Sequence, residues 1–584
     1  MSLRKPGGTE SALNARAGAG LRWAPLLAIG IAAFAVEIPF FFFGTPSGHD
    51  VEFHLYSWLE VLGQWKHGII YPRWAALANF AYGEPRFVFY PPASWTLGAG
   101  LSAIFPWTLA SCIYIWVALV AAGVSMFLLA RRLLESPKHD PQKLGPQNFA
   151  RRDAIFVAVL YAVNPYHLVI VYWRSAFAEL LASCLVPLLL LCVLKVVDET
   201  WRALVPLALV LAAAWLTNAP AAVMIHYSLA LLAVLVAWQR RSARILLVAA
   251  GAVALGTCLA AFYLLPATYE QRWIDIAQAV GEGSRPAESF LFSHTADAEH
   301  DAFNRIMSWV AVFEMVVVFG AAWGARQWRE TKRELWDVLL AWAIACSVLM
   351  IPLAGLLWNV LPKIEYMQFP WRWSLCLSMI FCWFVTMAFL KSDSVKSNSR
   401  RWWWRGAVCA AVLVVLVGAG YRYQAPWWDN AADLREMQDN MEAGTGYEGV
   451  EEYTPAGADA TGMAALNKDA RNVSVAGPAR AAIHVYRWEP ESRMFTAEMS
   501  AVDQLALRLL QYPAWRVEVN GRVVETAARP ETGQMLVPVQ AGMNRVEIRF
   551  VRTWDRRLGG WISVIAAVSV AGWILLLRRR RPVA

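Results

Sequence analysis

The feature that most constrains this chain is a series of long apolar runs. The first covers Trp23 to Phe43, and the others lie near 107–130, 154–173, 177–197, 203–216, 219–238, 245–266, 306–326, 336–357, 371–390, 406–420 and 561–577. A helix needs roughly 20 apolar residues to cross the hydrocarbon core of a bilayer. The sequence therefore predicts a polytopic α-helical membrane protein with about twelve transmembrane helices.

Composition points the same way. Hydrophobic residues make up 58% of the 584 residues and charged residues only 17%, against about 45–50% and about 25% in soluble domains. The 31 Trp residues suit the membrane interface. The net charge of +9 comes largely from basic residues beside apolar runs, so we expect the lipid bilayer, and no nucleic acid, as a partner.

The distribution of Lys and Arg predicts the orientation, because short cytoplasmic loops collect these residues. Alternate loops are basic, at 131–152, 240–244, 326–333, 391–405 and 578–581, whereas the loop 267–304 is acidic. Both termini are therefore predicted to be cytoplasmic. This alternation of basic and non-basic loops holds only if Ser94 to Phe105 does not cross the membrane as a separate span. The stretch is then either an interfacial helix or the start of the second span, bent at Pro106.

This topology divides the chain into four parts. They are a cytoplasmic tail (1–22), a transmembrane domain (23–420) with a large first outer loop (44–93), an extracytoplasmic β-rich domain (421–558), and a last helix with a basic tail (559–584). Alternating apolar residues near 515–519, 536–539 and 546–550, with turn signals at Asn520-Gly521, Gly533 and Gly542, predict a small β-sandwich-like domain.

The first outer loop carries the first candidate site. Apolar residues at helical spacing predict a helix over Val51 to Lys66, with Asp50 at its N-terminus. Asp50 either caps that helix or, alone or with Glu52, provides a carboxylate for general base work or for a hard metal ion. His49 and His54 either join this site or are hydrogen-bonded interfacial residues.

Other polar residues fall on the same predicted side. Arg73 and Arg86 can bind a phosphate through two N–H groups or contact lipid head groups, and Arg174 and Glu179 either contribute to a site or pair with each other. A single outward-facing polar site accounts for them most simply, with structural ion pairs as the alternative. The candidate substrate-binding residues are His49, His54, Arg73, Arg86, Arg174, Glu179, Asn218, Glu270, Gln368 and Arg372.

Several reaction classes lack their sequence signature. The chain has no P-loop, no GxSxG elbow, no HExxH motif and no dinucleotide-binding fingerprint. ATP-driven pumping, serine hydrolysis and zinc proteolysis are therefore without support. The eight Cys residues lie in apolar runs without CxxC spacing, which is typical of buried small hydrophobes.

A longer pattern gives a resemblance. The order GHD, YPRW, FYPP, RSAFAE, LTNAP, FYLLP and QFPWR resembles the bacterial membrane proteins known as 6-pyruvoyl-tetrahydropterin-synthase-related, which are similar to the GT-C superfamily of glycosyltransferases. The resemblance implies an enzyme of the bacterial cytoplasmic (inner) membrane. Its expected activity is transfer of a sugar, with inversion, from a polyprenyl-phosphate carrier on the outer face to a glycan or protein acceptor.

The resemblance also implies residue roles. The superfamily places an essential Asp or acidic pair in the first outer loop, where Asp50 matches and Glu52 is the possible second member. Arg174 and Arg372 are the preferred clamp for the departing lipid phosphate, ahead of Arg73 and Arg86. Because the chain has Asp-Val-Glu instead of a plain DxD motif, a divalent cation (Mg²⁺ or Mn²⁺) at Asp50 and Glu52 stays an open alternative.

Two non-catalytic functions compete with this one. A transporter or flippase for lipid-linked glycans would use the same outer cavity but needs polar residues through the core of the spans, which offer few besides Glu37. An envelope-biogenesis protein with a glycan-binding outer domain is the other alternative. In that domain Tyr512, Trp515 and Trp554 are candidates for stacking on sugars, or else core residues.

Overall fold

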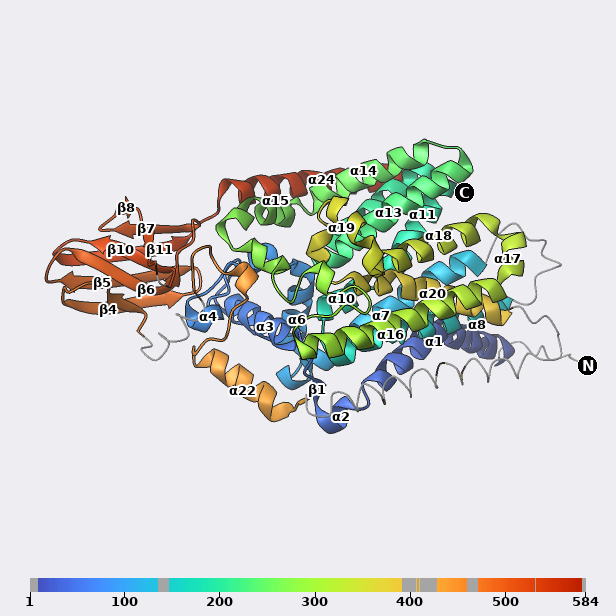
Figure 1. Ribbon diagram of the computed structural model, residues 1–584, viewed down its shortest axis with the longest axis horizontal. Coiled ribbons are helices and arrows are strands. Elements are labelled where there is room, and N and C mark those ends of the chain that lie inside the picture. The colour runs from blue at the N-terminus through green and yellow to red at the C-terminus, as the bar shows by residue number, and fades with distance from the viewer. Residues whose placement is uncertain are drawn as a thin grey trace, which may run out of the picture.

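The protein consists of a helical bundle with a β region near the C-terminus. The computed structural model describes residues 9–134, 147–390, 428–459, 471–530 and 532–579, together with the single residues Gly406, Cys409 and Gly418. In Figure 1 most of the strands lie at one end of the molecule, and the last helix returns from them along the helical bundle. Two ends of the bundle can thus be distinguished, and the one that carries the strands is called the β-domain end.

Most of the described chain is helical. The helices are α1 (Thr9–Val36), α2 (Phe40–Phe43), α3 (Val51–Lys66), α4 (Ala78–Ala81), α5 (Arg86–Phe89), α6 (Pro92–Ile104), α7 (Trp107–Leu134), α8 (Gln147–Ala162), α9 (Pro165–Val169), α10 (Phe177–Ala182), α11 (Leu185–Glu199), α12 (Leu204–Thr217), α13 (Ala219–Arg240), α14 (Arg244–Leu259), α15 (Ala261–Glu270), α16 (Ala298–Gly324), α17 (Arg326–Thr331), α18 (Arg333–Met350), α19 (Gly355–Val360), α20 (Ser374–Leu390), α22 (Ala431–Glu442) and α24 (Trp554–Arg579).

The apolar helices make this a multi-pass membrane protein. Eight described segments are long and apolar enough to cross a membrane, or up to ten if each of two bent helix pairs counts as one span. The predicted number was about twelve. One reason for the difference is that Phe177–Thr217 counts once among the eight segments, whereas the sequence predicts two spans there. The chain turns between α11 and α12 at Thr200, which has a positive φ of 48°, and α12 packs back against α10 and α11. The other is that the predicted span 406–420 lies outside the described residues apart from two single positions.

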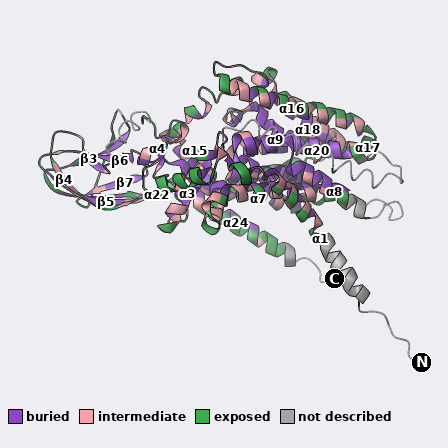
Figure 2. Cartoon of the chain, turned by 90° about the horizontal axis from the view of Figure 1, so that it is seen from below, coloured by how far each residue is buried: buried purple, intermediate pink, exposed green. Residues whose placement is uncertain are grey.

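Several helices expose apolar side chains on one face, as expected against lipid. Figure 2 shows exposed residues along α24, while the interior of the bundle is buried. Large exposed hydrophobic residues occur in α1, α16 and α24, and include Trp23, Ile31, Trp309, Val316, Trp561 and Val568. A soluble surface would not carry so continuous an apolar face.

The segment 44–93, which the sequence analysis predicts to be the first outer loop, folds largely as its periodicity predicts. The helix predicted over Val51 to Lys66 is confirmed with the same bounds by α3. The stretch from Ser94 to Phe105 forms the separate helix α6, which ends before Pro106, and α7 begins at Trp107. Since α6 has only 13 residues, it is too short to span a bilayer.

The strands form two antiparallel sheets apart from a two-stranded pair, β1 (Thr45–Pro46) with β2 (Trp428–Asp429). One sheet has the order β3-β6-β10-β9 and the other β4-β5-β11-β7-β8. The strands are β3 (Val473–Val475), β4 (Ala481–Glu489), β5 (Ser492–Met499), β6 (Asp503–Leu510), β7 (Trp515–Val519), β8 (Arg522–Val524), β9 (Ala527–Ala528), β10 (Gln534–Val539) and β11 (Gly542–Phe550). We refer to residues 473–550 as the β domain.

The predicted strands are confirmed in β7, β10 and β11. Asn520 and Gly521, both with positive φ, connect β7 to β8, as an Asn-Gly hairpin requires. Inward residues of both sheets, including Leu507 and Val537 of one and Phe495 of the other, share one buried cluster. The core of the β domain therefore lies between the two sheets.

The first outer loop is part of the same buried cluster. Trp74 is fully buried against the rings of Tyr512, Trp515 and Phe550. A Cβ on Gly83 would lie 2.0 Å from the Trp74 indole nitrogen, so this close approach requires glycine. Tyr512 and Trp515 are consequently core residues, and the prediction that they stack on sugars is wrong because their rings are buried.

Candidate functional site

Two distant segments meet at the start of α3. The backbone N–H of Asp50 donates to the carbonyl of Arg174 (2.8 Å), and that of Gly48 donates to Ser175 Oγ (3.0 Å). A Cβ on Gly48 would lie 2.7 Å from backbone atoms of both Arg174 and Ser175. The GHD motif is therefore pressed against the RSAFAE motif, which explains the glycine and places the Asp50 and Arg174 side chains side by side.

The Arg174 side of this contact has irregular backbone. Ile170–Arg174 is a π-helical turn, and Ser175 follows it in the left-handed region with φ 49°. Single π turns inside α-helical segments are frequent at functional sites, because the inserted residue redirects the side chains that follow. Here the turn ends at Arg174.

Asp50 does not cap α3, so the capping interpretation is wrong. Its carboxylate instead bonds His49 Nδ1 through Oδ1 (2.7 Å) and accepts from Arg174 Nη2 through Oδ2 (3.2 Å). Burial would by itself raise the pKa of Asp50, but the Arg174 charge and the His49 hydrogen bond outweigh it and hold the pKa well below its usual range. The Asp50 side chain is 26% exposed and that of His49 84%, so this carboxylate reaches the surface in its ionised form.

Below Asp50, Glu179 holds two arginines. Its Oε2 accepts from Arg174 Nη1 (2.6 Å) and lies 3.3 Å from Arg372 Nε, while Oε1 accepts from the Tyr166 hydroxyl (2.5 Å). All four of these side chains are buried. Arg174 thus connects a surface carboxylate to a buried one.

Arg372 is only partly used by this network. Its Nη1 donates to the carbonyl of Met367 (2.6 Å) and to Gln368 Oε1 (3.2 Å), and the Gln368 amide donates in turn to the carbonyl of Ala279. Despite its proximity to Glu179, the buried Nε has no partner with hydrogen-bond geometry among the described residues. Arg372 therefore keeps a donor available for an anion.

Aromatic rings hold the two guanidinium groups in place. Phe369 and Trp371 stack with their ring centroids 4.9 Å apart. The Arg174 guanidinium lies 5.0 Å from the Trp371 ring, and that of Arg372 lies 4.8 Å from the Phe369 ring. Since these cation–π contacts orient the groups without using their N–H donors, the QFPWR motif positions both cations.

His54 lies beside the cluster as a neutral ring. It is 2% exposed and stacks on Phe177 at 5.1 Å. Burial lowers the pKa of His54 to about 4, although the Asp50 charge opposes this shift. Tyr90, which the sequence analysis missed, lies edge-on to His54 at 6.0 Å.

A segment from beyond the bundle also reaches the site. The Tyr453 ring lies 6.3 Å from Phe53 on α3, and the neighbouring Glu452 is within electrostatic range of Arg372 and Asp50. Burial raises the pKa of Glu452. No local pattern pointed to these residues, because only the fold brings them to a helix about 400 positions earlier in the chain.

Three predicted residues in the first outer loop lie outside this cluster. Glu52 is exposed, and residues two apart on a helix do not face each other. Arg86 is buried in an ion pair with Glu84 (2.6 Å). Arg73 stacks on the Tyr71 ring at 4.2 Å. The structure therefore joins His49, His54, Arg174, Glu179, Gln368 and Arg372 to Asp50, but not these three.

Two further candidates have structural contacts of their own. Asn218 caps α13 by accepting from the Ala221 N–H (2.9 Å). Glu270 accepts from Nε and Nη2 of Arg556, both at 2.6 Å, and from the Tyr512 hydroxyl at 2.5 Å. This second network ties α15 to α24 and to the β domain.

The oxygen atoms around Asp50 do not form a suitable set of ligands for a divalent cation. Both carboxylate oxygens already contact nitrogen groups, and Glu52 does not face the same point. Within the described ranges, no group of three or more His, Cys, Asp or Glu side chains that could hold a metal ion occurs. We therefore assign no metal-dependent role to Asp50 and Glu52.

The sequence analysis also missed a carboxylate in the middle of a span. Glu314 of α16 is fully buried, and its Oε1 accepts from Ser378 of α20 (2.6 Å). Its Oε2 has no hydrogen-bond partner among the described residues. An ionisable residue at such a depth is costly and is commonly functional.

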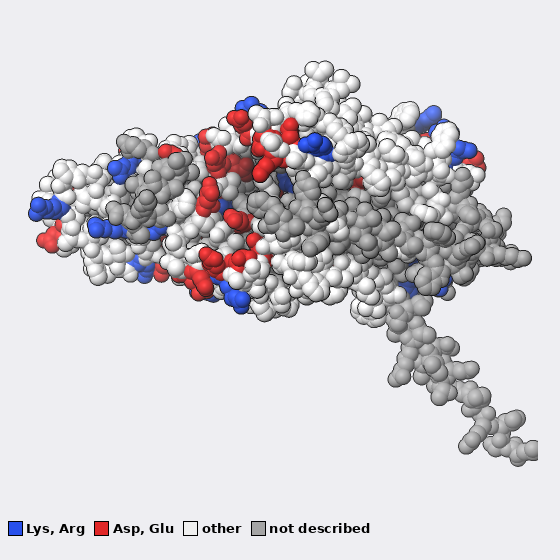
Figure 3. Space-filling model, turned by 60° about the horizontal axis from the view of Figure 1, so that its bottom comes forward, with Lys and Arg blue, Asp and Glu red and all other residues white. Residues whose placement is uncertain are grey.

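The surface around the cluster is acidic. Figure 3 shows Asp and Glu gathered between the β domain and the helical bundle. Helix α22, at this boundary in Figure 1, exposes Asp433, Glu436, Asp439 and Glu442. Such a surface disfavours a polyanionic partner.

Fold and site together define a multi-pass membrane protein with a partly exposed carboxylate above two buried arginines at its β-domain end. Comparison with protein-family models and with curated proteins finds no match to this chain. The functional argument therefore depends on the geometry of the Asp50 cluster itself.

Proposed function

We propose that the protein is a membrane glycosyltransferase that uses a polyprenyl-phosphate-linked sugar on the outer face of the cytoplasmic membrane. The observation that carries the proposal is the convergence of Asp50, Arg174, Glu179 and Arg372 from three distant segments. In this proposal the bundle is GT-C-like, the full chain has about twelve spans, and the two sheets of the β domain form a sandwich.

The chemistry needs a base on one side and cations on the other. An acceptor hydroxyl attacks the anomeric carbon, the bond from that carbon to the phosphate oxygen breaks, and the lipid phosphate leaves with the electron pair. Asp50 takes the hydroxyl proton, directly or through His49, while Arg174 and Arg372 hold the charge of the phosphate. The Arg372 Nε group, which lies 3.3 Å from Glu179 without a hydrogen bond, supports the second assignment.

Arg174 couples the two halves of this reaction. In the free protein its charge holds the pKa of Asp50 low, which keeps the carboxylate ionised but makes it a weak base. A phosphate that draws the Arg174 Nη2 group away from Asp50 removes part of that effect and raises the pKa of Asp50. Donor binding therefore activates the base.

The test is the variant Asp50→Asn in proteoliposomes supplied with a set of polyprenyl-phosphate sugars labelled in the sugar. Asn keeps an acceptor for Arg174 but loses the charge, so the variant should still fold, melt at a somewhat lower temperature than the wild type, and lose transfer by about 100-fold or more. Asp297→Asn, at a carboxylate that caps α16, is the matched control and should transfer normally. Normal transfer by the Asp50 variant would remove the catalytic role.

A transporter or flippase for lipid-linked glycans is the second candidate, because Glu314 provides the buried polar group that such a function requires. The same proteoliposomes separate the two functions. A transferase moves the label from lipid to acceptor, whereas a flippase changes only its accessibility from outside. Loss of flipping in Glu314→Gln, with no transfer by the wild type, favours the second candidate.

A further inference from the structure

A cavity lies at the end of the bundle opposite the β domain. It is lined by residues of α7, α11, α13, α18 and the position preceding α18, and its volume is about 330 Å³. This size falls at the lower end of the ~300–1,000 Å³ range of ligand sites in proteins. It shares no lining residue with the Asp50 cluster and is independent of the proposed function.

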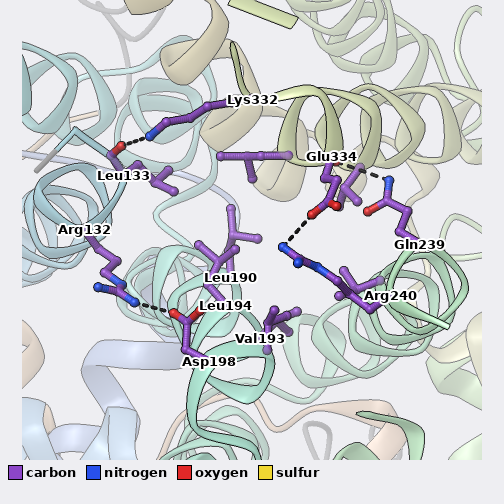
Figure 4. A pocket seen from close by; sticks show the side chains of 14 residues that line it. Arg132, Leu133, Leu190, Val193, Leu194, Asp198, Gln239, Arg240, Lys332 and Glu334 are labelled. Atoms are coloured by element: carbon purple, nitrogen blue, oxygen red, sulfur yellow. Dashed lines mark hydrogen bonds and ion pairs between the residues drawn. The ribbon is translucent and has the colours of Figure 1, made fainter. Parts of the chain in front are cut away.

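The cavity is lined by both charged and apolar side chains, as Figure 4 shows. On α11, Asp198 is followed deeper into the bundle by Val197, Leu194, Val193 and Leu190, and this series runs over about two helical turns, or ~12 Å. On α18, Leu335 and Val338 likewise follow Glu334. Each helix thus presents its charged residue at its end and apolar residues further in.

Among the described residues that line the cavity, three are cations and two are carboxylates. Arg240 pairs with Glu334 (2.6 Å) and Arg132 with Asp198, while the Lys332 ammonium donates to the carbonyl of Leu133. The four side chains of the two ion pairs are between 41% and 51% exposed. A guanidinium group has five N–H donors, and a single carboxylate uses only some of them. Arg132 and Arg240 can therefore each donate to a further anion.

Tryptophans place the charged side chains of the cavity at the membrane interface. Trp238 lies two residues before Arg240 and is 78% exposed, and Trp201 lies three residues after Asp198 and is 49% exposed. Exposed Trp residues at the ends of spanning helices are typical of the lipid head-group level. The apolar walls then extend towards the hydrocarbon.

We propose that this cavity binds one anionic phospholipid, with its phosphate among Arg132, Arg240 and Lys332 and part of an acyl chain along α11. Three observations support this occupant: the excess of cations, the change from polar to apolar along the helices, and the interfacial level marked by the Trp residues. In the topology predicted from the basic loops, the lipid comes from the cytoplasmic leaflet.

The experiment compares lipid binding to the purified full chain by native mass spectrometry. Phosphatidylglycerol should bind at least about tenfold more tightly than phosphatidylcholine, because only the first carries a net negative charge. Equal binding of the two lipids would overturn the proposal. Inorganic phosphate should not displace phosphatidylglycerol at comparable concentrations; displacement would instead identify a free phosphate as the ligand.

Variants assign the binding to this cavity. Arg132→Gln with Arg240→Gln should lower phosphatidylglycerol affinity by about tenfold or more. The matched control is Arg329→Gln with Arg333→Gln, since both of those arginines contact Asp337 near the same end of the bundle and do not line the cavity. Similar losses in both double variants would indicate general charge attraction and overturn the assignment.

A third variant keeps every charge and fills the apolar part. Leu194→Trp should remove the phosphatidylglycerol adduct while leaving the melting temperature without lipid unchanged. Because Leu194→Trp keeps all the arginines, it still tests lipid binding if the arginine variants fail to fold. Unchanged phosphatidylglycerol binding in Leu194→Trp would show that the acyl chain lies elsewhere.

Discussion

Two buried networks near the β-domain end contain the same groups but use them differently. In one, the Glu270 carboxylate accepts hydrogen bonds from Nε and Nη2 of Arg556 and from the hydroxyl of Tyr512. In the other, Glu179 is divided between Arg174, Arg372 and the hydroxyl of Tyr166. We call the Glu270 network closed because Arg556 binds both oxygens of this carboxylate and forms no ion pair with an exposed carboxylate among the described residues, although the buried Asp555 nearby also lacks hydrogen-bond partners there.

The Glu179 network is open at two points. Arg174 continues to the partly exposed Asp50, and the Nε group of Arg372 lacks a hydrogen-bond partner among the described residues. Buried polar groups are normally satisfied, and each exception calls for an explanation, of which a bound anion is one. The difference teaches that access to the surface, here through Asp50, distinguishes a candidate site from a structural clamp. Residue types and single unsatisfied donors do not, because Arg73 near Glu270 also has such a donor, Nη1.

The largest expected effect is on the closed network. Arg556→Gln leaves Glu270 buried without its charged partner, and breaking such a pair costs about 3–5 kcal/mol of folding stability. We expect a lower unfolding midpoint and faster proteolysis of the β domain. Arg516→Gln, at a half-exposed ion pair on β7, should change stability by less than about 1 kcal/mol. Equal effects of the two variants would contradict the description of Glu270 and Arg556 as a clamp.

The open network should respond in activity rather than in stability. Arg372→Lys keeps the charge but loses the planar fork, so kcat for sugar transfer should fall by about 100-fold with little change in melting temperature. The corresponding Arg556→Lys should lower the melting temperature and leave transfer per folded molecule unchanged. If Arg372→Lys loses only stability, the two networks do not differ as proposed.

Acid should affect the open network through His54. Its pKa of about 4 lies below the unfolded value near 6.5, so the unfolded chain binds more protons in this interval and stability falls as the pH drops from 6.5 towards 4. The contribution lost is about 3 kcal/mol. His54→Phe, which preserves the contact with Phe177, should remove this part of the acid sensitivity in urea unfolding. His294→Gln, at an exposed ring, should not.

Local sequence patterns predicted the elements that carry the site but not all of its contacts. The apolar spacing of Leu55, Trp58 and Leu62 is a property of neighbouring residues and predicted α3 with its bounds. In the same way, alternation predicted β7, β10 and β11. The strand β6, with the sequence DQLALRLL, was not predicted, because six of its eight residues are buried and the alternation is lost.

Pairing over long distances is what the sequence could not provide. The sequence predicts Glu270 as a site residue because its structural partner, Arg556, lies 286 positions away and cannot be recognised. It predicts Arg86 as a site residue because the ion pair with Glu84 gives no periodic signal. Asp50, Arg174 and Arg372 were grouped by predicted side of the membrane, which says nothing about distances. The hydrogen bond from the Asp50 N–H to the Arg174 carbonyl is the contact that makes the group a cluster.

The smallest expected effect gives the most closely matched test of the comparison, because a single hydroxyl can be removed from each network. Tyr166→Phe and Tyr512→Phe delete the hydrogen bonds to Glu179 and Glu270, each 2.5 Å long, and each should cost about 1–2 kcal/mol of stability. Tyr512→Phe should do no more than that, since Arg556 still binds both oxygens of Glu270. In Tyr166→Phe the freed oxygen of Glu179 attracts the arginines more strongly, so sugar transfer should also fall several-fold through a weaker hold on the phosphate. Parallel melting curves and transfer assays of the two variants measure this difference, and an equal activity loss in both would show that the Glu179 network is as closed as its counterpart.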